Sequence, residues 1–228
     1  MIKKIFPVFF LMFILIIFSC TGQADTVFVS VPDSNYFKFE QIIINTYNII
    51  DTEYGNLTHL PAWMRSFISG GIEEIEKLDS FYGKYVFLAL NESVNFSAQN
   101  FWVSNFSEVR DFTIMAARRI EKKMILSSTL YPDDEYGAFF EAMVKKANNT
   151  VFTGAVKEDS CWIKFISGNG IENADSDIYI SFLLLTIDIS LMQRIVTGMM
   201  NEIIADVSVT RTQRNNINRM RQNFFTGF

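Results

Sequence analysis

The longest apolar stretch of the chain lies at its start, where Ile5–Phe18 is interrupted only by Pro7. A helix over this stretch would be about 21 Å long, at about 1.5 Å per residue. That length falls short of a hydrocarbon core of about 30 Å. Lys3 and Lys4 precede the stretch. A positive start followed by a short apolar core predicts a secretory signal over residues 1–19 rather than a membrane-spanning helix.

Further along, four stretches repeat apolar residues at the three- and four-residue spacing of a helix. They are 61–78, 107–127, 135–147 and 188–204. Pro61 suits the first turn of the first helix, although Gly70-Gly71 weakens its middle. Asp188 or Ser190 is expected to cap the last helix.

The stretch Phe37–Tyr54 supports two interpretations. Its apolar spacing predicts a helix, whereas the β-branched run Ile42–Ile44 is equally typical of a strand. We favour the helix, which would form an N-terminal extension over 36–60.

Strands are predicted between the helices. Lys84–Asn91 and Ile178–Ile187 are apolar on both faces, which is typical of strands covered on both sides. Thr150–Val156 and Cys161–Ile166 predict two more strands, joined by a polar turn, with Trp162 in the core. Residues 91–105 show no clear period. The pattern predicts an α+β fold over 61–205, a small antiparallel sheet of three or four strands packed against two or more helices, with helical N- and C-terminal extensions.

A motif at the end of the first apolar stretch bears on where the chain is located. Ile17-Phe18-Ser19-Cys20 resembles a lipobox, the cleavage site of bacterial lipoproteins, and the bulky Phe18 resembles spirochaete-type lipoboxes. The resemblance implies cleavage between Ser19 and Cys20 and acylation of Cys20, for example with palmitate. The protein would then be lipid-anchored in the cell envelope, with the outer membrane as its expected location and residues 20–35 as a tether. An ordinary cleaved signal with an incidental cysteine is the alternative.

Charge and cysteine content narrow the chemistry. The net charge of −5 becomes −7 without the two lysines of the signal. An acidic chain argues against nucleic acid as a partner, because phosphate binding needs a basic face. If Cys20 is acylated, Cys161 is left without a disulfide partner and is expected to be a buried structural thiol. With His59 as the only histidine, we expect no metal site, no cofactor and no catalytic residue.

Basic residues gather in the 107–127 helix. They are Arg118, Arg119, Lys122 and Lys123. We favour a solvated helix face for this cluster. The alternative is a contact with phosphate or lipid headgroups.

The last segment, 206–228, is a basic amphipathic tail. Its arginines are Arg211, Arg214, Arg219 and Arg221. A basic amphipathic segment on a tethered protein can lie on anionic headgroups, so these arginines are candidates for membrane contact. The alternative, which we favour slightly, is that Ile217, Met220 and Phe224 dock the tail on its own domain.

Three short motifs carry a resemblance to a protein family. They are Pro61-Ala62-Trp63, Ala116-Ala117-Arg118-Arg119-Ile120, and Thr153-Gly154-Ala155-Val156 with Asp159 and Trp162. Their order over 61–204 resembles the "LPP-twenty" family of twenty-kilodalton bacterial lipoproteins and the related N-terminal domain of flagellar assembly protein T. The resemblance implies a small α/β domain with helices on an antiparallel sheet and no known enzymatic activity.

These observations favour a non-enzymatic structural or protein-interaction module, anchored to the membrane through acylated Cys20 and contacting other envelope proteins. A carrier of lipids or other apolar ligands is the alternative, because binding pockets are mostly apolar and phenylalanine is abundant. A hydrolase is disfavoured, because the carboxylates of Asp133-Asp134-Glu135 lie in a predicted turn without a partner base.

Overall fold

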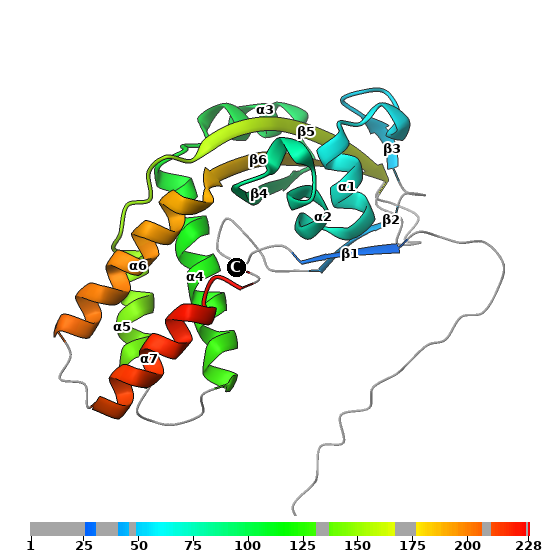
Figure 1. Ribbon diagram of the computed structural model, residues 1–228. Coiled ribbons are helices and arrows are strands. Elements are labelled where there is room, and N and C mark those ends of the chain that lie inside the picture. Colours follow the sequence, from blue (N-terminus) through cyan, green and yellow to red (C-terminus); the bar gives the residue numbers. More distant parts are fainter. Residues whose placement is uncertain are drawn as a thin grey trace, which may run out of the picture.

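A computed structural model describes residues 26–30, 41–45, 49–130, 137–166, 177–206, 211–226 and 228. The predicted signal over 1–19, the Ser19–Cys20 junction and the carboxylates at 133–135 lie outside these ranges. Within them the chain has the predicted α+β fold, in which helices pack on an antiparallel sheet (Figure 1).

Four strands form one antiparallel sheet in the order β3-β5-β6-β4. Their bounds, in that order, are Ile49–Thr52, Val156–Ile166, Asp177–Asp188 and Lys84–Ser93. β4 and β6 contain the two runs predicted to be covered on both faces, and β4 pairs with β6 along its full length. A separate antiparallel pair is formed by β1 (Thr26–Ser30) and β2 (Gln41–Asn45).

The helix favoured for Phe37–Tyr54 is wrong over the described part of that stretch, which contains β2 and β3. β-Branched side chains lose little freedom on a pleated surface, and both strands find a partner strand. β3 joins the edge of the main sheet, where Thr52 pairs with Ile163 of β5. β1 lies at 26–30, within the range expected to be a tether.

Of the two strands expected between 150 and 166, the second is β5, which begins at Val156, and the strand expected over Thr150–Val156 does not form. The polar residues taken for a turn lie within β5, because β3 pairs only with the far half of β5 and leaves Lys157–Ser160 on an open edge. The register with β6 shifts between Lys157 and Asp159, which marks a bulge at Glu158. Charged side chains and a bulge are common protections of an open sheet edge.

Seven α-helices accompany the strands in the described ranges. They are α1 (Ala62–Gly70), α2 (Ile72–Glu76), α3 (Phe96–Asn105), α4 (Arg110–Leu130), α5 (Gly137–Asn148), α6 (Ile189–Asp206) and α7 (Arg211–Asn223). The helix expected over 61–78 is split into α1 and α2, because Gly71 ends α1 at a φ of 79°, which favours glycine. Asp188 caps α6 as predicted, since its Oδ1 accepts the N–H of Leu191 at 3.0 Å.

The helix α3 was not predicted. Asn95 caps it by accepting the N–H groups of Ser97 and Ala98 at 2.9 and 3.3 Å. Apolar side chains lie around most of its circumference, so the sequence shows no helical period. The cap was therefore the one local signal for this helix.

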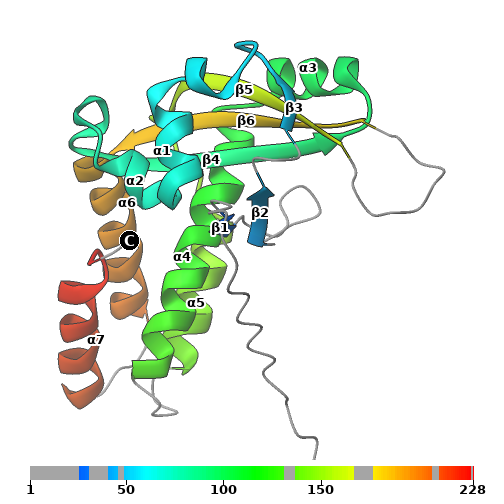
Figure 2. The same ribbon diagram turned by 90° about the vertical axis from the view of Figure 1, so that its right-hand side faces the viewer.

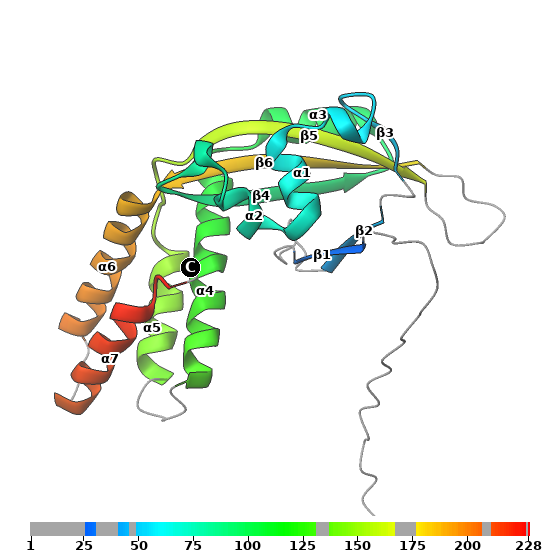
Figure 3. The same cartoon turned by 45° about the vertical axis from the view of Figure 1, so that its right-hand side comes forward.

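The alternation of side chains along the strands divides the interior into two cores. Even-numbered residues of β4 and β6, such as Leu88 and Leu184, pack against α1 and α2. Odd-numbered residues, such as Phe87 and Leu185, face the core built with α4 to α7. These four helices extend away from the sheet, and α3 lies at the opposite end of the molecule (Figures 2 and 3).

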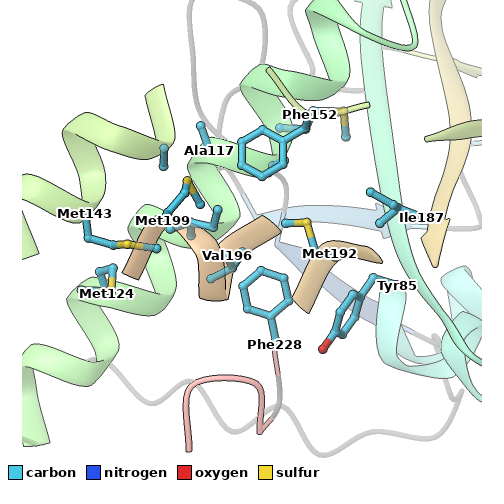
Figure 4. Packing of buried hydrophobic residues seen from close by; sticks show 14 of the residues in the cluster. Tyr85, Ala117, Met124, Met143, Phe152, Ile187, Met192, Val196, Met199 and Phe228 are labelled. Carbon is cyan, nitrogen blue, oxygen red and sulfur yellow. The ribbon is translucent and has the colours of Figure 1, made fainter. Parts of the chain in front are cut away.

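The core between the sheet and the helices α4 to α7 is rich in methionine. Met124, Met143, Met192 and Met199 meet there and are buried (Figure 4). The unbranched methionine side chain fills irregular gaps between helices that come from distant parts of the chain.

Candidate functional site

The four candidate arginines lie on α7, and the apolar side of this helix is docked on the protein. Ile217, Met220 and Phe224 are buried with Phe228 in the helical core. The Phe228 ring lies 5.0 Å from that of Tyr85 and 5.5 Å from that of Phe224. The tail is therefore docked on its own domain, which is the alternative that the sequence analysis favoured.

The outer face of α7 is basic and rich in amides. Arg211, Arg214 and Arg219 are exposed, and so are the neighbouring side chains Asn215, Asn218 and Gln222. Arg221 is half-buried and donates to Asn201 of α6 at 2.7 Å. The sequence has no aspartate or glutamate after Asp206. The outer face of α7 therefore carries positive charge without compensating carboxylates of its own.

Arg119 on α4 is not on a solvated face, which corrects the interpretation favoured for the 118–123 cluster. Its guanidinium donates to the Val86 carbonyl at 2.8 Å, to Glu76 at 3.3 Å and to the main-chain oxygen of Phe228. The rings of Tyr85, Phe87 and Phe228 surround it at 4.8 to 5.2 Å. Burial lowers the pKa of Arg119 and Glu76 opposes that shift, while an arginine stays protonated in proteins.

Arg119 thus connects three segments that are distant in sequence. Glu76 at the end of α2 also accepts the Val86 N–H at 3.1 Å, so two edge groups of β4 are paired by side chains. Lys123, one turn after Arg119, donates to the Thr226 carbonyl. One feature of the sequence could have indicated that Arg119 faces the interior. Arg119 follows the buried Phe112 by seven residues, which places both on one side of α4.

The residues that carry the family resemblance have structural contacts. Trp63 of α1 donates its indole N–H to Asp159 of β5 at 2.7 Å. Gly154 has a φ of 90°, and a Cβ there would lie 2.5 Å from the Leu191 side chain. Ala116 is buried in the helical core. Packing and hydrogen bonding at these positions therefore account for the spacing of the motifs.

Trp162 lies on a predicted strand but is only half-buried, which corrects its expected place in the core. Its ring contacts Phe96 of α3 at 5.1 Å and Tyr179 of β6 at 6.0 Å. These three rings join α3 to the sheet. The buried Gln99 fixes the same helix, because its amide donates to the carbonyls of Tyr179 and Asn91 at 2.7 and 2.9 Å.

The opposite side of α3 presents apolar side chains to solvent. Phe101 is 70% exposed and Val94, in the turn before the helix, is 67% exposed. Phe96, whose ring also contacts Trp162 and Tyr179, is 37% exposed. We call Val94, Phe96 and Phe101 the α3 patch. An exposed group of large apolar residues on a fixed helix is typical of a contact surface.

A second apolar surface is an open groove between α4 and α5. Its volume is about 400 Å³ and it is lined by Met124, Ile125, Phe140, Glu141, Val144 and Lys145. Met124, one of the buried core methionines (Figure 4), belongs to its lining, and Ile125 beside it is 58% exposed.

The cysteine, glutamate and histidine side chains that could take part in reactions lie in surroundings that explain them by packing and hydrogen bonding. Cys161 is buried as predicted, and burial raises the pKa of its thiol to about 12. Burial and the nearby Asp159 raise the pKa of Glu53, although a backbone hydrogen bond opposes them. His59 ends a 3-10 turn (Leu57–His59) and its N–H donates to Asn56 at 3.2 Å. Among the described residues, no three His, Cys, Asp or Glu side chains cluster as metal ligands would.

No helix in the described ranges is both long enough and apolar enough to cross a bilayer. Comparisons with protein-family models, with curated proteins and with solved structures return no match.

Proposed function

We propose that this chain is a lipid-anchored lipoprotein of the bacterial cell envelope, held in the outer membrane, that works by protein contact rather than by catalysis. The observation that carries the contact function is the α3 patch. The lipobox resemblance at Cys20 supports the anchor, and the packing roles of the motif residues are consistent with a non-enzymatic domain.

The construction of α3 supports a binding role for its outer face. The helix is fixed to the sheet by the three hydrogen bonds between Gln99, Asn91 and Tyr179 and by the edge-to-face and tilted ring contacts of Phe96, Trp162 and Tyr179. A helix fixed in this way presents Phe101 without a large ordering cost on binding. Aromatic side chains commonly anchor protein interfaces.

A site-specific crosslinker tests the contact function. A photoreactive phenylalanine analogue at position 101 is expected to crosslink a defined envelope protein in intact cells. Tyr82 is the matched control position, because it is an aromatic residue that is 89% exposed outside α3. Crosslinking with equal yield from both positions, or with no loss on adding Val94→Ser, would contradict the proposal.

The anchor has its own test. Cys20→Ala is expected to abolish labelling by an alkyne-palmitate in cells and to release the protein from the membrane fraction. Cys161→Ala, which removes the other cysteine, is the control and should leave labelling unchanged. Equal labelling of Cys20→Ala and the parent would show that the cysteine is incidental to an ordinary signal.

A carrier of lipids or apolar ligands is the second candidate, and the groove between α4 and α5 is the observation that favours it. Its volume is within the range of small-molecule sites, about 300–1,000 Å³. Native mass spectrometry of gently extracted protein distinguishes the two functions. A stoichiometric bound lipid that is lost in Val144→Glu would favour the carrier.

A further inference from the structure

We infer that the outer face of α7 is a second membrane contact, one that binds anionic headgroups while the helix stays docked on its own domain. This inference rests on the proposed anchor at Cys20 for its location. The outer face of α7 is a surface separate from the anchor, and its contact would determine which side of the domain faces the membrane.

The exposed face of α7 is positively charged. Arg211, Arg214 and Arg219 are exposed on one helix in a chain whose net charge is −5. No aspartate or glutamate follows Asp206, so these arginines have no acidic side chain on their own helix. Guanidinium groups bind phosphate oxygens through two parallel hydrogen bonds. A lipid phosphate surface is therefore a chemically suitable partner.

The docking of α7 on the domain determines how this helix can contact a membrane. An amphipathic helix that inserts into a bilayer uses an apolar face. In α7 that face is occupied, since Ile217, Met220 and Phe224 are buried in the core. Arg119 and Lys123 hold the main chain just beyond the helix. The contact we propose is therefore electrostatic and peripheral, and it should be sensitive to salt.

The chain between the proposed anchor and the first strand is short. Only residues 21–25 separate Cys20 from the first residue of β1. An extended chain spans at most about 3.5 Å per residue, so the start of β1 would lie within about 20 Å of the acylated cysteine. Such a tether raises the effective concentration of headgroups around the domain, which makes a weak contact sufficient.

The positions of α7 and α3 in the fold determine how the domain would face the membrane. In all three orientations α7 and α3 lie toward opposite ends of the molecule (Figures 1, 2 and 3). A domain attached through both Cys20 and α7 would turn the α3 patch away from the membrane. The patch would then be accessible to an envelope protein.

Vesicle flotation of the chain from residue 21, which contains every described element and no Cys20, tests the contact separately from the anchor. The chain should float with vesicles that contain an anionic phospholipid and not with vesicles of neutral phosphatidylcholine. Arg211→Gln/Arg214→Gln/Arg219→Gln should lower the partition coefficient on the order of a hundredfold, since each basic residue near such a surface contributes roughly fivefold. Salt at about 1 M, where the Debye length is about 3 Å, should release the parent chain.

The matched control is Lys77→Gln/Lys122→Gln/Lys145→Gln, which removes three exposed positive charges from outside α7. It should float like the parent, and circular dichroism should show that both variants are folded. The inference is overturned if the parent does not float, if the arginine variant floats equally well, or if the lysine control loses as much binding. Failure here leaves the labelling of Cys20 unaffected, so the two proposals fail separately.

Discussion

Replacing Phe224 by alanine distinguishes a docked α7 from a detachable tail. The Phe224 ring is 1% exposed and contacts the rings of Phe225 and Phe228 at 5.3 and 5.5 Å. Truncation of a buried phenylalanine to alanine costs about 3–5 kcal/mol. We expect about 3 kcal/mol, because the neighbouring rings can partly collapse into the space.

Urea denaturation followed by circular dichroism measures this loss. The control is Phe101→Ala, which removes the same side chain from a position that is 70% exposed and should change stability by less than about 0.5 kcal/mol. The slope of the unfolding free energy with urea should be unchanged in both variants. A loss below about 1 kcal/mol for Phe224→Ala would show that α7 contributes little to the folded domain, and it would remove the argument against insertion.

Three further predictions concern the interior. Arg119→Leu should destabilise the protein by about 3 kcal/mol in the same assay, because it leaves Glu76 and two main-chain oxygens without their donor. Arg119→Lys should restore only part of the lost stability, since an ammonium lacks the planar guanidinium fork. Full stability in Arg119→Lys would contradict this account. Gln99→Leu should cost about 1–3 kcal/mol, because the carbonyls of Asn91 and Tyr179 lose a donor, and it should lower hydrogen-exchange protection in α3 but not in α6. In a Cys20→Ala background, Cys161 should react with a disulfide reagent only as fast as the protein unfolds. Since folding raises the pKa of this thiol from 9.0 to about 12, its contribution to stability should be complete below pH 9 and be lost between pH 9 and 12; an identical pH slope in Cys161→Ala would contradict this.

Several elements could be predicted from local pattern. The runs that became β4 and β6 are apolar on both faces, and in the structure both faces are covered by helices. The helices α4, α5 and α6 follow from three- and four-residue spacing, and Asp188 marks the start of α6. In each case the signal and the structure lie within about ten to twenty consecutive residues, so neighbouring side chains contain the information.

Other elements depended on partners that are distant in the chain. The residues Lys157–Ser160 look like a turn, yet they extend β5 because β6 pairs with them. Their polar side chains find partners from distant segments, since Trp63 donates to Asp159 and Lys84 donates to Glu158. β3 is a strand because β5 offers it an edge. The helix α3 has no period, because it is covered on one side by Trp162 and Tyr179 while its other side remains apolar and exposed.

The sequence by itself determined which residues are charged, which are apolar and where the elements can begin, including the basic composition of the last segment and the candidate lipid anchor at Cys20. The tertiary structure decided which charges are buried. Arg119 and Arg118 are adjacent and chemically identical, yet Arg119 lies between the rings of Tyr85, Phe87 and Phe228, whereas Arg118 pairs with Glu121 along its own helix. The physical reason is that burial of a charge requires several partners at once, and those partners come from α2, β4 and the segment after α7, which only the folded chain brings together.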